Sequence, residues 1–359
     1  MGAPLGKLSP DRFRRLIAPH LGTVRHEVVV GPGAGLDCAI VKLGAGRVIA
    51  LTTDPLSIVP ALGPAASARL SCHLLASDLW TSGIAPQYVT VDFNLPPSVD
   101  DETFAKYWRA MSAEWEALFV AVVAGHTGRY PGGDSTLLGA GTLIGIGDEQ
   151  RYLTPAMARP GDVVLVTKGC AIEAAAIAAH LIPERLRARI GAGGVERARA
   201  LVDRVSVVAD CRTLIGAGVR RTPGEPGLGV TALHDATEGG VLGGLLELAK
   251  ASGNDMRVEA ALIPLAVEAR AACEAWGGID PPWTLSEGTL IAAVRPAFVA
   301  AVRAALTDEG IPAAEVGEVM EGSGRLWLTA ADGSVRTIDA PEPDPYWAAY
   351  DRAVRERWT

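Results

Sequence analysis

The chain has few aromatic residues, no excess of basic charge and no long apolar run. Aromatic side chains make up 5% of the 359 residues, so a core has to be built mainly from Ala, Val, Leu and Ile. With 33 Lys+Arg against 41 Asp+Glu, the net charge of -8 gives no electrostatic footprint for nucleic acid or an anionic membrane. The longest apolar run, residues 117–124, is far shorter than the ~20 residues that a membrane helix needs. We therefore expect neither nucleic acid nor a membrane as a partner.

Cysteines are also scarce and never paired in a C-x-x-C motif. There are five of them, at positions 38, 72, 170, 211 and 273. An odd number of scattered cysteines indicates a reducing compartment and excludes both a disulfide framework and a structural zinc site of the usual spacing. The arginines at 12, 14 and 15 are not followed by the apolar stretch of a signal peptide. The sequence thus predicts a cytoplasmic protein.

The common nucleotide-binding and hydrolase motifs are absent. No G-x-x-x-x-G-K-[ST], G-x-S-x-G or S-x-x-K motif occurs, and the glycines at 31, 33 and 35 have the wrong spacing for G-x-G-x-x-G. If this protein binds a nucleotide, it must do so through a different motif.

Hydrophobic periodicity predicts a mixed α/β fold in two domains with a C-terminal tail. Strand-like runs rich in β-branched residues alternate with helical patterns of three- and four-residue spacing. The pattern breaks near residues 148–160, which gives an N-terminal domain at 1–155, a C-terminal domain at 156–340 and a tail at 341–359. The tail is predicted to form an amphipathic helix that presents Trp347, Tyr350 and Val354. A single helix is expected over 195–215, followed by an exposed loop over 216–229.

Three aspartates lie in separate segments of the N-terminal half. Asp37 follows a glycine-rich turn, Asp54 closes a predicted strand over residues 47–53, and Asp78 sits late in a predicted helix. Carboxylate oxygens are the ligands that Mg²⁺ prefers, and nucleotide phosphates can complete its coordination. The plainer interpretation is that Asp37 and Asp54 form turns and that Asp78 is a solvated helix residue.

Three further motifs follow predicted strands or precede them. Gly125-His126-Thr127 comes after the run 119–123, where α/β proteins tend to place ligand contacts, although His126 could equally be a turn residue. Asp235-Ala236-Thr237-Glu238-Gly239-Gly240 stands at a helix start, which favours either a bound anion or a cap formed by Thr237. Ser286-Glu287-Gly288 precedes an apolar strand and is a weaker signal alone.

Taken in order, these motifs resemble one superfamily. It includes aminoimidazole-ribonucleotide synthetase, selenophosphate synthetase, thiamine-monophosphate kinase and the hydrogenase-maturation carbamoyl dehydratase HypE. The matching elements begin with Gly35-Leu36-Asp37-Cys38-Ala39, Thr52-Thr53-Asp54 and the helix end at Ser77-Asp78. Gly125-His126-Thr127, the Asp235–Gly240 segment and Ser286-Glu287-Gly288 follow in the same order.

The resemblance implies a fold, a set of ligands and roles for individual residues. It implies the two-domain fold of the aminoimidazole-ribonucleotide synthetase type, a homodimer built through the N-terminal domains, and ATP with Mg²⁺ bound along a cleft. The implied metal ligands are Asp37, Asp54 and Asp78, which would also contact the phosphates. The other implied cofactor-binding residues are Gly35, Gly125, His126, Thr127, Thr237, Gly239 and Gly240. The implied catalytic residues are His126, Asp235 and Glu287.

Within the superfamily, Gly-His-Thr and Ser-Glu-Gly are most similar to the HypE branch. The family's C-terminal cysteine has no counterpart here, since the last cysteine is Cys273. The acidic residue that follows Gly-His-Thr in the family is Gly128 here, and the asparagine upstream of the helix aspartate is Leu75. The missing cysteine argues against dehydration of a group carried by a tail cysteine. The changes at Gly128 and Leu75 are compatible with a relative that binds a nucleotide without catalysis.

The activity that the resemblance implies is ATP-dependent and requires Mg²⁺. An amide-type or other oxygen of a small-molecule or protein-bound substrate would be activated by phosphoryl transfer. Two alternatives stay open: a small-molecule kinase resembling thiamine-monophosphate kinase, and a non-catalytic nucleotide-binding or scaffold relative.

Overall fold

The structure is a computed structural model that describes residues 5–133, 137–218 and 229–359. Contacts divide the chain into two compact units. Unit 1 comprises Met1–His26, Pro32–Leu36 and Leu153–Thr359, and unit 2 comprises Glu27–Gly31 and Asp37–Tyr152. Thus the start of the chain packs with its second half. Both units combine a sheet with helices, so the predicted mixed α/β fold is confirmed.

Unit 2 is built on a six-stranded sheet in the order β1-β2-β3-β6-β4-β5. Its strands are β1 (Val28–Val30), β2 (Ala39–Gly44), β3 (Arg47–Leu56), β4 (Tyr88–Leu95), β5 (Ala121–Arg129) and β6 (Gly139–Asp148). β3 and β6 pair along their whole length, from Arg47 opposite Asp148 to Leu56 opposite Gly139. β4 and β5 are parallel and are connected through α3, as a parallel pair requires a crossover.

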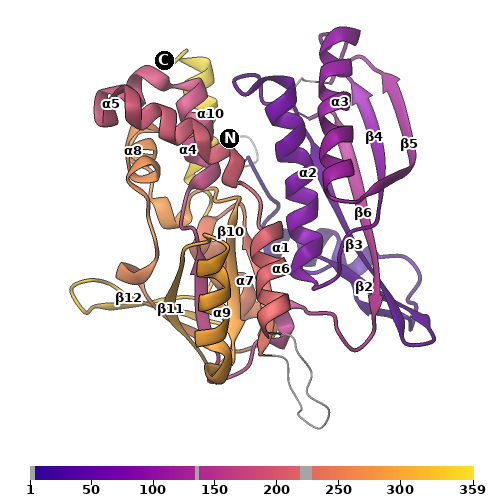
Figure 1. Cartoon of the computed structure of the whole chain (residues 1–359), viewed down its shortest axis with the longest axis vertical. Helices are drawn as coiled ribbons and strands as arrows, with labels where there is room; N and C mark the ends of the chain where they lie inside the picture. The colour runs from indigo at the N-terminus through magenta and orange to yellow at the C-terminus, as the bar shows by residue number, and fades with distance from the viewer. Residues whose placement is uncertain (1–4, 134–136, 219–228) are drawn as a thin grey trace. The chain divides into compact units, whose positions relative to one another are not determined.

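Two helices, α2 (Gly63–Thr81) and α3 (Asp101–Ala117), pack against one another beside this sheet (Figure 1). The Asp100 side chain caps α3 by accepting from the Thr103 N–H at 2.7 Å. α3 buries Tyr107, Met111 and Trp115, which recur every four residues and so share one face of the helix. Burying side chains of this size stabilises the fold by roughly 1.5–3 kcal/mol each.

Unit 1 contains a seven-stranded sheet in the order β13-β12-β9-β11-β7-β10-β8. Its strands are β7 (Val163–Thr167), β8 (Val230–Ala236), β9 (Asp255–Glu259), β10 (Thr289–Val294), β11 (Ala313–Met320), β12 (Leu326–Thr329) and β13 (Val335–Ile338). Its helices are α1 (Pro10–Leu16), α4 (Ile172–Leu181), α5 (Pro183–Arg199), α6 (Val208–Gly218), α7 (Gly240–Ser252), α8 (Val267–Ala275), α9 (Pro296–Asp308) and α10 (Pro345–Arg355). The edge strand β8 and its neighbour β10 are buried along their entire length, which explains the nearly continuous apolar run of β10.

The predicted single helix over 195–215 is wrong. α5 ends at Arg199, a 3₁₀ turn covers Ala200–Arg204, and α6 starts anew at Val208. The connection buries Val205 and Val207, and the Ser206 hydroxyl accepts from the Val208 N–H at 3.3 Å. Apolar residues that anchor a turn have here the spacing of a helix, so periodicity alone did not reveal the break. Most of the predicted loop over 216–229 lies outside the described residues.

Several strands extend beyond their predicted ends. β3 continues through Asp54 to Leu56, β5 contains His126, and β8 contains Asp235. The polar residues that were expected to close these strands therefore lie within the hydrogen-bonded ladders. A polar side chain does not interrupt a ladder, because the backbone forms the hydrogen bonds and successive side chains point to opposite faces.

The C-terminal tail forms a helix as predicted, but its buried face differs. α10 buries Tyr346, Ala349 and Ala353, whereas Val354 is 50% exposed. Tyr346 packs edge-on against Trp276 with ring centroids 5.4 Å apart. Because the alanines at 349 and 353 are small, α10 can pack closely against the residues that it covers. Among the helices that the structure describes, none combines the length and apolarity needed to cross a membrane.

Candidate functional site

The three predicted metal-binding aspartates belong to segments that meet in unit 2. Asp78 on α2 accepts a hydrogen bond from the Thr52 hydroxyl of β3 at 2.8 Å, and the Asp78 carbonyl accepts from the Cys38 thiol at 3.0 Å. Asp37 adjoins Cys38, and Asp54 lies two residues beyond Thr52, on the same face of β3. All three aspartates are half-buried. Unit 2 thus joins the segments that carry these oxygen donors.

The sheet register places Asp54 and Gly125 of the Gly125-His126-Thr127 motif in one row across the strands. Asp54 is opposite Gly141 of β6, Gly141 is opposite Val91 of β4, and Val91 is opposite Gly125 of β5. Three strand spacings of about 4.8 Å separate the ends of this row by roughly 14 Å. Leu75 of α2 lies against Gly141, so this row faces α2.

His126 points to the other face of that sheet. Side chains alternate along β5, so His126 lies opposite the face shared by Gly125 and Asp54, while Thr127 returns to it. The His126 Nε2 atom is 2.9 Å from the Tyr130 hydroxyl, and both side chains are largely exposed. Unit 2 therefore does not bring the His126 imidazole together with Asp54 and Asp78, and its predicted role stays a prediction.

Gly128 has a structural explanation in this chain. A Cβ atom at this position would lie 2.5 Å from the Tyr130 hydroxyl oxygen and 2.6 Å from its ring. The Tyr130 ring stacks on His126 with centroids 6.4 Å apart. The departure from the family's acidic residue thus accompanies a tyrosine that occupies the space beside the histidine.

In unit 1, the two predicted catalytic carboxylates lie near one corner of the seven-stranded sheet. Asp235 on β8 is opposite Leu290 of β10, and Glu287 lies in the loop that leads into β10. Their side chains are 2% and 3% exposed. The Ser286 N–H donates to the Thr237 carbonyl at 3.2 Å, which ties the two motifs together.

Ser286 connects this corner to a third segment. Its hydroxyl oxygen accepts from the Ala171 N–H at 2.7 Å and donates to the Thr284 carbonyl at 2.7 Å. Ala171 immediately precedes α4 and has a positive φ of 57°. The Ser-Glu-Gly motif therefore anchors the β7–α4 loop through its serine, a role that its spacing did not predict.

Two glycines form the turn before α7. Gly239 and Gly240 have φ values of 84° and 62°, a left-handed conformation that favours glycine. A Cβ at Gly240 would lie 2.5 Å from the Pro282 carbonyl oxygen. The capping alternative for Thr237 is not what the structure shows: Gly239 is the N-cap residue, and its N–H donates to the Asp344 carboxylate at 2.9 Å.

Gly35 also has a packing role. It has a φ of 73°, and a Cβ would lie 2.9 Å from both the Cβ and the carbonyl oxygen of Glu247 on α7. Glu247 pairs with the His234 Nε2 at 3.0 Å and with the Lys7 ammonium at 3.5 Å. Burial alone raises the pKa of Glu247, but Lys7 and His234 together lower it to about 2.

A buried ion pair escaped the sequence reasoning. The Lys168 ammonium donates to Asp210 at 2.8 Å and to the Ser206 carbonyl at 2.7 Å, and the Thr167 hydroxyl donates to the other oxygen of Asp210 at 2.6 Å. Burial lowers the pKa of Lys168, and the Asp210 charge opposes that effect. A lysine directly after a buried strand was the available signal, but its partner lies 42 residues away.

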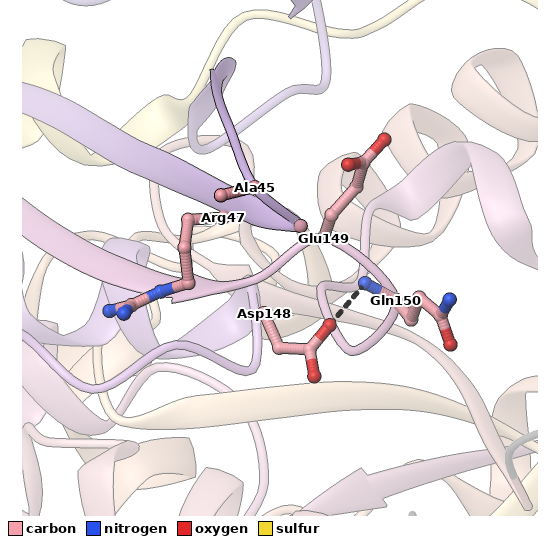
Figure 2. Close-up of a pocket in the computed structure, with 6 residues that line it drawn as sticks. Ala45, Arg47, Asp148, Glu149 and Gln150 are labelled. Atoms are coloured by element: carbon pink, nitrogen blue, oxygen red, sulfur yellow. Dashed lines mark hydrogen bonds between the residues drawn. The ribbon is translucent and has the colours of Figure 1, made fainter.

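The hollow shown in Figure 2 is lined by none of the predicted site residues. It has a volume of about 650 Å³ and is formed by the β2–β3 turn (Ala45, Gly46 and Arg47) and the end of β6. There the Asp148 carboxylate accepts from the Gln150 N–H at 2.7 Å.

Comparisons with known proteins identify relatives over most of the chain. Residues 35–147 match the family model of the N-terminal domain of AIR synthase related protein, and residues 159–328 match that of its C-terminal domain. Carbamoyl dehydratase HypE of Escherichia coli (strain K12) is 30% identical over 318 residues, which cover 87% of both chains. These findings confirm the resemblance inferred from the order of the motifs.

Solved structures give the same result. A crystal structure of E. coli HypE matches with a TM-score of 0.68 at 26% identity, covering 93% of this chain and 97% of that one. AaThiL complexed with AMPPCP and TMP matches with a TM-score of 0.66 at 18% identity, covering 94% and 98%. The second match shows a shared fold.

Proposed function

Because the chain belongs to the AIR synthase-related family, we propose that it is an ATP-dependent enzyme that activates a substrate oxygen by phosphoryl transfer. The acceptor in this proposal is an amide-type or similar oxygen of a small-molecule or protein-bound substrate. The E. coli relative is named a carbamoyl dehydratase, and AaThiL was solved with the ATP analogue AMPPCP. The first name supports dehydration chemistry, and the second supports binding of an ATP-like nucleotide.

The convergence of the aspartate segments in unit 2 is the observation that carries the proposal. Thr52 and Cys38 hydrogen-bond to Asp78, so residues from β3, from the start of β2 and from α2 share one region. Half-buried carboxylates supply the hard oxygen donors that Mg²⁺ prefers, so Asp37, Asp54 and Asp78 fit this ion. When bound, Mg²⁺ neutralises charge on the transferring phosphates.

Residues of this chain would then orient the nucleotide and the acceptor. In our proposal, the Thr52 hydroxyl fixes the Asp78 carboxylate, and Thr127 lies on the sheet face of Asp54. The Asp235 and Glu287 carboxylates serve the acceptor side, where their burial excludes water. Positioning and electrostatics are the main contributions that phosphoryl transfer needs from a protein.

We also propose that the enzyme is a homodimer formed through unit 2. Its edge strand β5 exposes Val122 and Val123 by 42% and 54%, and Phe119 just before it by 88%. An edge strand with exposed apolar side chains is a favourable surface for a second copy.

Replacement of the aspartates tests the proposal. Asp54→Asn and Asp78→Asn should each lower Mg²⁺-dependent ADP release at least ~100-fold, because an amide is a poor ligand for a hard cation. Asp101→Asn is the matched control, since Asp101 is a fully exposed aspartate of unit 2 that pairs with Arg129. Undiminished turnover in both site variants would refute the proposal.

The identity of the phosphorylated product separates the two forms of the chemistry. A synthetase or dehydratase releases inorganic phosphate, whereas a kinase leaves the γ-phosphoryl group on the acceptor. ³¹P NMR of the reaction products distinguishes these outcomes. Nucleotide binding without any ADP release would instead indicate a scaffold.

A further inference from the structure

The Asp344 carboxylate of the C-terminal tail binds the Gly239–Gly240 turn, which belongs to the Asp235–Gly240 motif. Asp344 accepts from the Gly239 N–H through Oδ2 at 2.9 Å and from the Tyr346 N–H through Oδ1 at 2.8 Å. The same side chain therefore caps α10 and the turn that begins α7. Asp344 lies outside both regions that match the family models, which end at residue 328.

The Asp344 side chain also reaches the Ser-Glu-Gly loop. The Leu285 N–H, one residue before Ser286, lies close enough to help lower the pKa of Asp344. Since Ser286 in turn holds the β7–α4 loop through Ala171, one carboxylate lies at the junction of the tail with both unit 1 motifs.

The junction contains two more carboxylates. Glu238 accepts from the Lys7 N–H at 2.5 Å, and Glu173 of α4 is 6% exposed. The Glu173 Oε2 atom has no hydrogen-bond partner among the described residues. Tyr346 of α10 is buried beside these carboxylates. The groups that face Asp344 are thus Glu173 from α4, Glu238 from the turn, Tyr346 from α10 and Cys273 from α8.

We infer that Asp344 is a positioning residue that holds the Gly239–Gly240 turn in its conformation and links it to the docked tail. The contact itself is independent of the proposed function, which enters only in assigning this turn to the acceptor side. Loss of the carboxylate frees the Gly239 N–H and allows the turn to open.

In this inference, the buried and partly unpartnered carboxylates of the junction also give the docking of the tail a pH dependence. Burial, with the Glu238 charge adding to it, raises the pKa of Asp344 to about 6, against the backbone N–H groups that lower it. Burial, with Glu238 and Asp344 adding to it, raises the pKa of Glu173 to about 8. Both values exceed those of unfolded chains (3.8 and 4.5), so the stabilisation is complete in acid and is lost as the pH rises to about 6 for Asp344 and to about 8 for Glu173.

Hydrogen exchange measured by mass spectrometry on the full chain tests this inference. Asp344→Ser keeps a good helix cap for Tyr346 but is too short to reach Gly239. Exchange in a peptide over 237–245 should rise about tenfold or more, as expected for loss of a hydrogen bond to a charged group, while α10 stays protected. Asp100→Ala, which removes the equivalent cap of α3, should leave this peptide unchanged.

The pH dependence of exchange is a second measurement, which a purely structural helix cap would leave unchanged. In the wild type, exchange of the 237–245 peptide, corrected for intrinsic rates, should rise between pH 6 and pH 8.5. Glu173→Gln should flatten that rise. The inference is overturned if Asp344→Ser leaves exchange within twofold of the wild type, if α10 loses protection along with the turn, or if Glu173→Gln leaves the profile unaltered. Since no readout here uses ATP, these results stand apart from the Asp54 and Asp78 tests.

Discussion

The carboxylates of the two units occupy opposite settings. In unit 2, Asp54 and Asp78 are half-buried on the face of a sheet and near the end of a helix. In unit 1, Asp235 and Glu287 are almost fully buried among backbone segments that hydrogen-bond to one another. A hard cation can be bound only by carboxylate oxygens that it can reach. The buried corner of unit 1 instead depends on backbone segments held in fixed positions. In our proposal, the accessible carboxylates of unit 2 hold the ion, while the buried carboxylates of unit 1 lie in a corner whose backbone is fixed by hydrogen bonds.

This comparison predicts that substitutions in the unit 1 turn lower stability most. Gly240→Ala should destabilise the protein by about 3 kcal/mol or more, because its Cβ meets two backbone carbonyls and its φ is left-handed. Gly239→Ala, whose Cβ has only an ordinary contact at 3.5 Å, should lose about 1–2 kcal/mol. Urea unfolding followed by tryptophan fluorescence measures both. Equal effects would contradict the steric account of Gly240.

Acid should remove the stabilisation provided by Glu247. Its pKa of about 2 lies below the ordinary 4.5, so its contribution is complete above pH 4.5 and disappears as the pH falls through 2. Glu247→Gln should therefore lower stability at pH 7 by at most about 3 kcal/mol, and the difference from the wild type should shrink in acid. Glu268→Gln, which removes an ion pair with the exposed Arg197 side chain, is the control with a smaller effect. A difference that is constant with pH would show that ionisation of Glu247 is irrelevant.

In unit 2, a matched pair of threonines should affect ligand binding more than folding. Thr52→Val removes the hydrogen bond to Asp78 and should weaken Mg²⁺·ATP binding about fivefold, corresponding to ~1 kcal/mol. Thr53→Val removes a hydroxyl contact with Thr142 on the other face of β3 and should leave that affinity unchanged. Calorimetric titration distinguishes them. If both variants bind equally well, Thr52 does not orient Asp78 for the ion.

Local sequence patterns predicted which helices and strands exist better than they predicted where these elements end. α2, α3 and the buried strands β7 and β10 follow from periodicity, because each buries a regular face or run. The sequence did not predict that β5 extends through His126. Polar residues neither favour nor disfavour such an extension, because the neighbouring strands set the pairing of the ladder. For the same reason, the face on which His126 lies depends on register and not on its motif.

The candidate site shows a similar limit. The order of the aspartate and glycine motifs was informative, and the structure joins the three aspartate segments through Thr52 and Cys38. Asp344 gave no comparable signal, because its partner Gly239 is 105 residues away and the contact exists only after the tail docks. Contacts of such long range depend on the folded arrangement of unit 1.

A crystal structure with AMPPCP and Mn²⁺ in place of Mg²⁺ tests the central claim most directly. The account predicts an anomalous peak beside the triphosphate with carboxylate oxygens of Asp54 and Asp78 in its coordination shell, at roughly 2.1–2.2 Å. A peak coordinated by other residues, with both aspartates beyond about 4 Å, would contradict it.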